Sequence, residues 1–154
     1  TVMNAFSPDI QPAITGREQP LAALLYRSTA NISPEGLRAS GALDEFVSRN
    51  MEAGLTGHLH LEDGVFYQYL EGPSRGVAAA WAAIRRDPLH DDVQELSHTP
   101  IPARRFPRWS MGFSDGAKRS LYDWAARSGL SLKGRHAAPA LAAFMEYASS
   151  PVAR

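Results

Sequence analysis

Gln68 is a primary amide at a position where the sequence predicts an apolar surface. It lies between Phe66 and Leu70 in a run of residues that favours a β-strand, where alternate side chains share one face. Burying an amide costs free energy unless it is hydrogen-bonded. Because it carries one acceptor oxygen and two donor hydrogens, it can bridge two polar groups in more than one arrangement. Gln68 is therefore a satisfied structural amide, a residue on an exposed edge, or part of a binding site.

Asn50 is a second polar residue on an apolar face. It follows Phe46 by four residues and Leu43 by seven, so in a helix it shares their stripe. The alternative for Asn50 alone is a cap near the end of that helix.

The composition excludes several classes of protein. The 154 residues include 16 Lys plus Arg and 16 Asp plus Glu, so the formal net charge is zero, which argues against general nucleic-acid binding. The absence of cysteine excludes disulfides, thiolate metal sites and cysteine nucleophiles. No apolar run approaches the roughly 18 residues of a membrane helix, and no secretory signal is visible. We therefore expect a cytoplasmic, one-domain protein with no membrane partner.

The elements that must position these amides can be read from local signals. Residues 21–29 favour a strand, and Ser33 followed by Pro34 predicts a helix that runs to about Ala53 and stops at Gly54. The remaining elements are expected to be a strand over 57–61, a tight hairpin turn at 62–64, a strand over 65–71, a helix from 74 to about 85, and strands over 93–101 and 109–113.

The order β-α-β-β-α-β-β predicts an α+β, ferredoxin-like fold. We expect a five-stranded sheet with two helices on one face. Helical patterns after Ala117 predict C-terminal helices that cap the other face.

The chain from Leu24 to Phe113 resembles the BLUF domain family, blue-light sensors that use flavin adenine dinucleotide (FAD). Five short motifs, in order and with family-like spacing, carry the resemblance: Leu25-Tyr26-Arg27-Ser28, Gly54-Leu55-Thr56-Gly57, Gln68-Tyr69-Leu70-Glu71-Gly72, Asp87-Pro88-Leu89-His90, and Arg104-Arg105-Phe106-Pro107-Arg108-Trp109-Ser110-Met111-Gly112-Phe113. The resemblance implies a photosensor core over 21–115. Residues 1–20 show no sustained period and are expected to be a flexible arm, and the helical patterns predict an extension over 116–154.

The resemblance also implies roles for individual residues in binding FAD non-covalently. Tyr26 matches the photoactive tyrosine, and Gln68 matches the glutamine that hydrogen-bonds both that tyrosine and the flavin. Asn50 matches the asparagine that binds the carbonyl and amide edge of the flavin ring. Trp109 and Met111 match the pair implicated in passing the signal outward.

The implied function is a blue-light photoreceptor without catalytic turnover. Light drives electron and proton transfer from Tyr26, and the hydrogen bonds of Gln68 rearrange to give a reversible, red-shifted signalling state. With no effector domain in the sequence, the signal is expected to pass through the C-terminal helices to a homo-oligomer or a separate effector protein.

The resemblance also points to candidates for the phosphate contacts. Asp87 and His90 align with family positions near the phosphates and adenosine, and Arg86 and Arg49 are candidate cationic partners. A basic residue typical of the family is replaced by Ala83. The alternative is a solvated helix end.

Other readings of the sequence remain open. His58, His60 and Glu62 share one strand face, which suits either a metal ion or a half-exposed surface; we predict no metal site. The alternative functions are a flavin-binding or scaffolding module without light response, and a small ferredoxin-like hydrolase.

Overall fold

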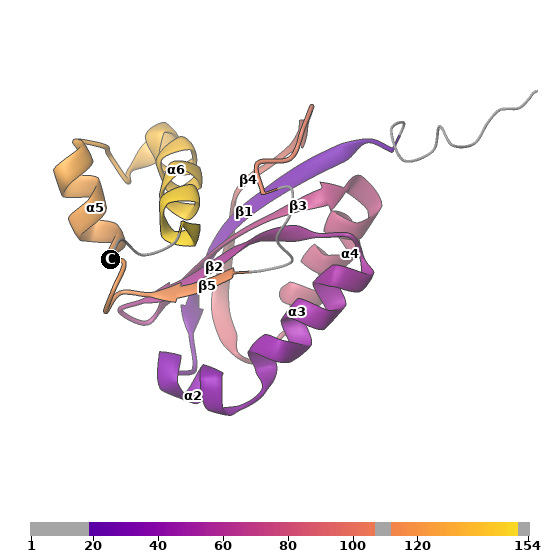
Figure 1. Ribbon diagram of the computed structural model, residues 1–154, viewed down its shortest axis with the longest axis horizontal. Helices are drawn as coiled ribbons and strands as arrows, with labels where there is room; N and C mark the ends of the chain where they lie inside the picture. The colour runs from indigo at the N-terminus through magenta and orange to yellow at the C-terminus, as the bar shows by residue number, and fades with distance from the viewer. Residues whose placement is uncertain (1–18, 107–111, 151–154) are drawn as a thin grey trace, which may run out of the picture.

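The computed structural model describes residues 19–106 and 112–150, which form one five-stranded sheet with helices on both faces (Figure 1). The α+β fold class is confirmed. In chain order the elements are β1 (Leu21–Ala30), α2 (Pro34–Ala39), α3 (Ala42–Glu52), β2 (Thr56–Glu62), β3 (Val65–Pro73), α4 (Ser74–Ile84), β4 (His90–Ile101), β5 (Gly112–Asp115), α5 (Leu121–Ser128), the 3-10 helix η1 (Gly134–His136) and α6 (Ala137–Ser149).

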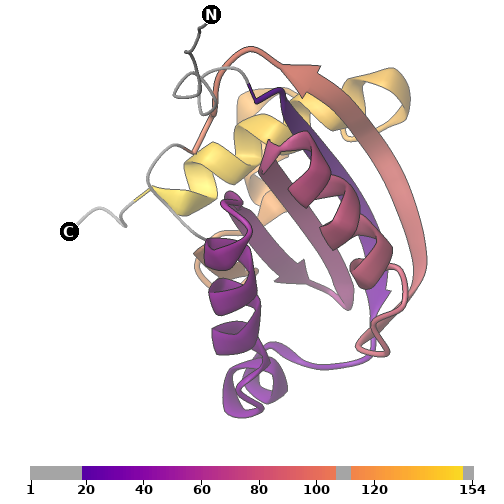
Figure 2. The ribbon, with the colours of Figure 1, turned by 90° about the vertical axis from the view of Figure 1, so that its right-hand side faces the viewer.

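The strands lie in the order β4-β1-β3-β2-β5. β1 pairs antiparallel with β3 and β4, β2 pairs antiparallel with β3, and β5 runs parallel to β2. Helices α3 and α4 cover one face of the sheet, and α5 and α6 lie on the other (Figures 1 and 2). The sheet therefore separates two compartments that share the central strands.

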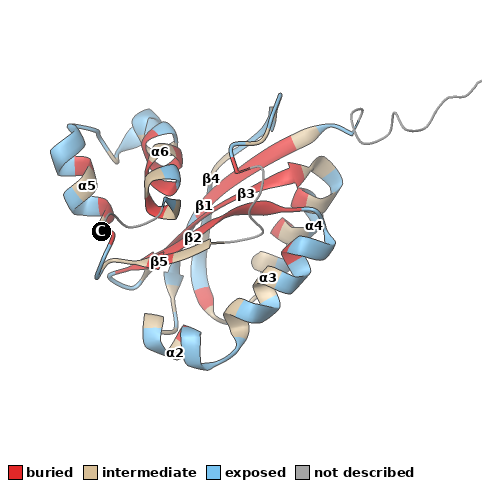
Figure 3. Ribbon diagram, in the orientation of Figure 1, coloured by how far each residue is buried: buried red, intermediate tan, exposed pale blue. Residues whose placement is uncertain are grey.

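Successive side chains of the central strands point to opposite faces of the sheet and so contribute to both compartments. Leu24 and Tyr26 of β1 pack with Trp81 on the α4 side, whereas Leu25 packs with Phe144 on the α6 side. Figure 3 shows the central strands buried along most of their length. Most side chains on both faces of the central strands are therefore buried.

The prediction of one continuous helix from Ser33 to Ala53 is wrong. Ser33 does cap α2, because its Oγ accepts from the backbone N–H of Gly36 at 2.9 Å, with Pro34 at the first helical position. The helical path then breaks at Gly41, which adopts φ +80° and begins α3. A residue without Cβ enters this left-handed region at little cost, so glycine permits the sharp turn between the two helices.

The hairpin between β2 and β3 is confirmed. Asp63 and Gly64 have φ +51° and +74°, the paired left-handed conformation of a two-residue hairpin turn. The arm predicted over 1–20 lies almost entirely outside the described residues. The strand expected over 109–113 is described only from Gly112 onward. Within the described part of the chain, no helix is both long and apolar enough to cross a membrane.

Candidate functional site

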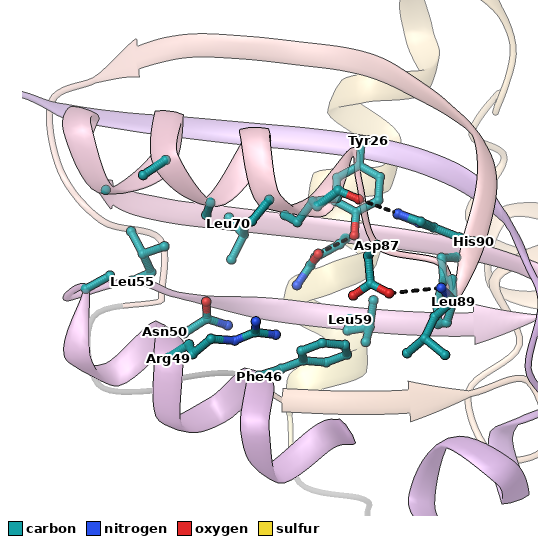
Figure 4. A pocket seen from close by; sticks show the side chains of 18 residues that line it. Tyr26, Phe46, Arg49, Asn50, Leu55, Leu59, Leu70, Asp87, Leu89 and His90 are labelled. Carbon is teal, nitrogen blue, oxygen red and sulfur yellow. Dashed lines mark hydrogen bonds between the residues drawn. The ribbon is translucent and has the colours of Figure 1, made fainter. Parts of the chain in front are cut away.

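A pocket lies between α3, α4 and the sheet face that carries Tyr26 and Gln68 (Figure 4). Its cavity volume is about 280 Å³, near the lower end of ordinary small-molecule sites. The lining residues are Tyr26, Phe46, Arg49, Asn50, Ala53, Leu55, Leu59, Phe66, Gln68, Leu70, Gly76, Ala79, Ala80, Ala83, Ile84, Asp87, Leu89 and His90. Most are apolar or small, with a few polar groups that converge between them.

Tyr26 and Gln68 form the polar centre of the pocket. They face each other across the β1–β3 pair, and the Tyr26 hydroxyl donates a hydrogen bond to Gln68 Oε1. The two side chains are 4% and 6% exposed. Burial, and secondly the negative charge of Asp87, raise the pKa of Tyr26 above its usual value. The phenol therefore keeps its proton at physiological pH and holds it on the bond to the amide.

Aromatic neighbours fix the orientation of the Tyr26 ring. The Trp81 ring of α4 lies against it, with centroids 5.3 Å apart and planes tilted by 39°. The His90 ring meets it edge-on at 6.0 Å. Because two rings contact it, the Tyr26 ring has little freedom to turn its hydroxyl away from Gln68.

Asn50 and Arg49 come from the last turn of α3 and line the pocket from the side opposite α4 (Figure 4). Asn50 is buried, and its backbone carbonyl accepts from Leu55 N at 2.8 Å in the turn that leads into β2. Ala53, not Asn50, is the C-cap of the helix. Arg49 is exposed at the rim, with its guanidinium 5.4 Å from the centre of the Phe46 ring.

His90 lines the pocket, but its ring nitrogens bond to the protein. Nε2 lies 2.6 Å from the carbonyl oxygen of Ile84, and Nδ1 lies 2.7 Å from Ser28 Oγ. Since a carbonyl can only accept, Nε2 carries a proton. His90 thus joins the end of α4 to β1 and presents the body of its ring to the pocket.

The other candidates are distributed unevenly. Asp87 lines the pocket and accepts from Leu89 N at 2.9 Å, which shapes the turn after α4. Arg86 is exposed and does not line the pocket. Trp109 and Met111 lie outside the described residues. Six of the nine predicted site residues therefore share one pocket.

The apolar walls of the pocket were not predicted as site residues. Phe46 lies on the apolar helix stripe described above, and Phe46, Ala80 and Ile84 all line the pocket. For Phe46, its position on the same stripe of α3 as Asn50 was the available signal. A helix stripe that carries an unpaired polar residue can face a ligand instead of a core.

The alternative of a half-exposed face for His58 and His60 is wrong. They are 1% and 0% exposed and face the compartment of α6, away from the pocket. Within residues 19–106 and 112–150, no group of three His, Cys, Asp or Glu side chains is placed to hold a metal ion.

The chemistry of the pocket fits a flat, conjugated ring with a polar edge. Apolar side chains on α3, α4 and the sheet can contact the ring faces, and Asn50 and Gln68 offer both donors and acceptors to its edge. The buried phenol of Tyr26 lies within the same lining. A flavin has these properties.

A family model described as sensors of blue-light using FAD (BLUF) matches residues 21–112. The chain is 34% identical over 92 residues to photoactivated adenylate cyclase subunit beta of Euglena longa, covering 59% of this chain and 11% of that protein. It is 36% identical over 99 residues to the blue light- and temperature-regulated antirepressor BluF of Escherichia coli (strain K12), covering 62% and 24%. The chain thus spans a quarter or less of these relatives.

Solved structures extend the similarity beyond the matched segment. The dark-state structure of BlrB, a BLUF protein, has a TM-score of 0.71 at 28% identity and covers 84% of this chain and 97% of that one. The ground state of BlsA has a TM-score of 0.61 at 27% identity and covers 71% and 73%.

Proposed function

The chain belongs to the BLUF family of blue-light sensors that use FAD, and from that membership we propose that Tyr26 and Gln68 are its light-responsive pair. The observation that carries the proposal is the buried hydrogen bond from the Tyr26 hydroxyl to Gln68 Oε1 within the pocket. A neutral phenol bonded to an amide that can also donate is a pair with two hydrogen-bonding arrangements.

The pocket residues divide into three binding roles. Phe46, Leu59 and Ile84 are among the apolar side chains that would contact the faces of the flavin ring, and Asn50 would bind its polar edge together with Gln68. Arg49 at the rim would contact the phosphates, because it is the one guanidinium among the lining residues. When bound, the flavin supplies absorption of blue light and, once excited, a strong oxidant.

Tyr26 would give up an electron and a proton on illumination and regain both, so that it returns to the neutral phenol while Gln68 remains rearranged. Its raised pKa keeps the hydroxyl protonated in the dark, and the bond to Gln68 defines the direction in which the proton can leave. Gln68 then changes which of its groups faces Tyr26, by rotation or by a change of tautomer. A buried polar group that loses its partner costs about 1–3 kcal/mol, which is enough to bias a neighbouring two-state element.

We propose that the output of this chain is carried by its C-terminal helices. Residues 21–115 act as the photosensor core and residues 116–154 as the extension that reports the state of the core. The core has no turnover of its own in this proposal, and the signal passes to a homo-oligomer or a separate effector protein. The low coverage of the cyclase and antirepressor relatives supports treating their effector activities as properties of those proteins.

The visible spectrum of the purified, FAD-loaded protein tests the function. We expect a flavin spectrum in the dark, a shift to longer wavelength after blue light, and thermal return in darkness. A yellow protein with an unchanging spectrum would indicate a flavin-binding module without light response. A protein that does not take up flavin and hydrolyses acyl phosphates would instead support the hydrolase alternative.

A further inference from the structure

A second buried polar cluster lies on the opposite face of the sheet from the pocket. His58 Nε2 is 2.8 Å from Ser114 Oγ, and His60 Nδ1 is 2.6 Å from the same oxygen. His60 Nε2 is 2.8 Å from Glu62 Oε1. All four side chains are at most 9% exposed. We refer to His58, Ser114, His60 and Glu62 as the β2–β5 polar chain.

The hydrogen atoms of the polar chain can be assigned from its ends. The Glu62 carboxylate only accepts, so His60 Nε2 carries a proton. Burial lowers the pKa of His60 despite the nearby Glu62, so the ring is neutral and its Nδ1 is an acceptor. The Ser114 hydroxyl must therefore donate to His60 and accept from His58 Nε2. Glu62 thus sets the tautomer of His60, and Ser114 passes that constraint on to His58.

The polar chain continues into the first turn of α5. Glu62 Oε1 accepts from the backbone N–H of Leu121 at 2.7 Å, and Oε2 accepts from Ser120 Oγ at 2.8 Å. Ser120 is the N-cap of α5. A carboxylate at this position satisfies a helix N–H and is stabilised by the helix dipole. The orientation of Glu62 therefore helps to decide where α5 begins and how it docks.

Two glycines let β5 lie directly on the polar chain. A Cβ at Gly112 would stand 2.7 Å from His58 Nδ1, and a Cβ at Gly116 would stand 2.6 Å from Glu62 Cγ. These separations are too short for a real side chain, so β5 approaches both ends of the polar chain only because glycine occupies both positions. The close fit leaves β5 little room to move without disturbing the polar chain.

The loop after β5 also holds the end of α6. The Arg119 guanidinium donates to the carbonyl oxygens of Tyr147 at 2.7 Å and Ser150 at 2.8 Å. Phe144 of α6 meets the His60 ring edge-on at 4.7 Å. The same short segment thus contacts the beginning of α5 and the end of α6.

We propose that the β2–β5 polar chain ties the position of strand β5 to the docking of helix α5, with Ser114 as the positioning residue. A displacement of β5 along β2 removes Ser114 from both histidines at once, because one hydroxyl serves both. His60 Nδ1 then loses its donor, so the His60 ring loses the bond that holds it in place against Glu62 and, through Glu62, against α5. Any role of this coupling in light signalling rests on the proposed function. The coupling itself is a property of the folded protein in the dark.

Hydrogen exchange of the α5 amides in the dark, FAD-loaded protein tests the coupling. In Ser114→Ala we expect the amide of Leu121 to exchange on the order of tenfold faster, the size that corresponds to one lost buried partner. Ser149→Ala is the matched control, since Ser149 Oγ donates only to Glu146 O within α6, and it should leave Leu121 unchanged. Ser114→Thr keeps the hydroxyl and should restore slow exchange.

Two dark outcomes overturn the inference. One is unchanged exchange at Leu121 in Ser114→Ala. The other is an equal increase in amide exchange rates across β1 and β3, which would show that the substitution lowers the stability of the whole fold. Illumination then separates the coupling from the photochemistry: Ser114→Ala should keep the red shift and lose the light-dependent change at Leu121. If wild type shows no red shift, the proposed function fails, and the dark comparison still decides this inference.

Discussion

Tyr26 and Gln68 lie directly opposite each other on antiparallel strands, and the phenol donates its hydrogen bond to the amide oxygen. Neighbouring antiparallel strands hold such a pair at a fixed separation, so the bond does not depend on a flexible loop. The polar centre of the pocket is therefore built into the register of β1 and β3, and substitutions at either end can be interpreted without allowing for backbone movement.

Tyr26→Phe should bind FAD and show no red shift, because the ring and its packing remain while the donor hydroxyl is lost. Absorption spectra before and after blue light check this. Tyr122→Phe is the control, since Tyr122 is 43% exposed and bonds to Tyr67 on the other face of the sheet. A normal photocycle in Tyr26→Phe would refute the assigned role.

Gln68→Leu should also lose the red shift while keeping flavin bound. Leucine fills a similar volume but neither accepts from Tyr26 nor donates. The buried hydroxyl is then left without this acceptor, so the free energy of unfolding should fall by about 1–3 kcal/mol in urea titrations. Gln94→Leu on the exposed part of β4 should change neither quantity. A light-induced red shift in Gln68→Leu would contradict the proposal.

Substitutions of Arg49 and Arg86 should affect FAD affinity differently. Arg49→Ala removes the guanidinium at the pocket rim and should weaken FAD binding by roughly tenfold, with a smaller effect on riboflavin, which has no phosphate. Arg86→Ala should change the affinity by less than about twofold, because Arg86 is exposed and outside the lining. Titration of the apoprotein measures both. Equal losses of affinity in the two variants would contradict the assignment of the phosphate contact to Arg49 alone.

Protonation of His58 should make the fold sensitive to acid. Burial, followed by the nearby His60 and Arg119, lowers the pKa of His58 from 6.5 to about 4. Between these values the unfolded chain binds more protons, so the free energy of unfolding is intact above pH 6.5 and falls as the pH drops toward 4. The loss from this residue amounts to roughly 3 kcal/mol.

Urea unfolding at pH 7 and pH 4 checks the acid effect. His58→Leu should show a shallower loss of stability than wild type, whereas His98→Leu, on the exposed strand β4, should behave like wild type. If the free energy of unfolding falls by the same amount between pH 7 and pH 4 in His58→Leu and in wild type, His58 does not titrate in this range.

Local patterns predicted much of this architecture. The helical period placed Asn50, and strand alternation placed Gln68, because each depends only on neighbours in sequence. The Asp63-Gly64 pair likewise predicted a hairpin turn from local sequence alone. The break at Gly41 was missed because a glycine inside an apolar helical pattern is compatible with an unbroken helix.

Long-range packing was harder to predict. Alternation shows that His58 and His60 share a face, but it cannot show that a helix more than 60 residues away covers that face. The burial of these rings follows from the docking of α6, and their bonds depend on the parallel pairing of β5. Neither the docking of α6 nor the pairing of β5 with β2 can be predicted from the residues next to His58 and His60 in sequence.

Strand β2 presents one residue to each compartment in turn. Leu59 lines the pocket, and its immediate neighbours His58 and His60 belong to the polar chain beneath α6. A small rotation of this strand about its own axis would move the pocket wall and both imidazoles together. In the proposed function, the light-responsive pair and the helices proposed to carry the output therefore lie on opposite sides of one sheet, and a signal between them would have to cross only a single layer of backbone.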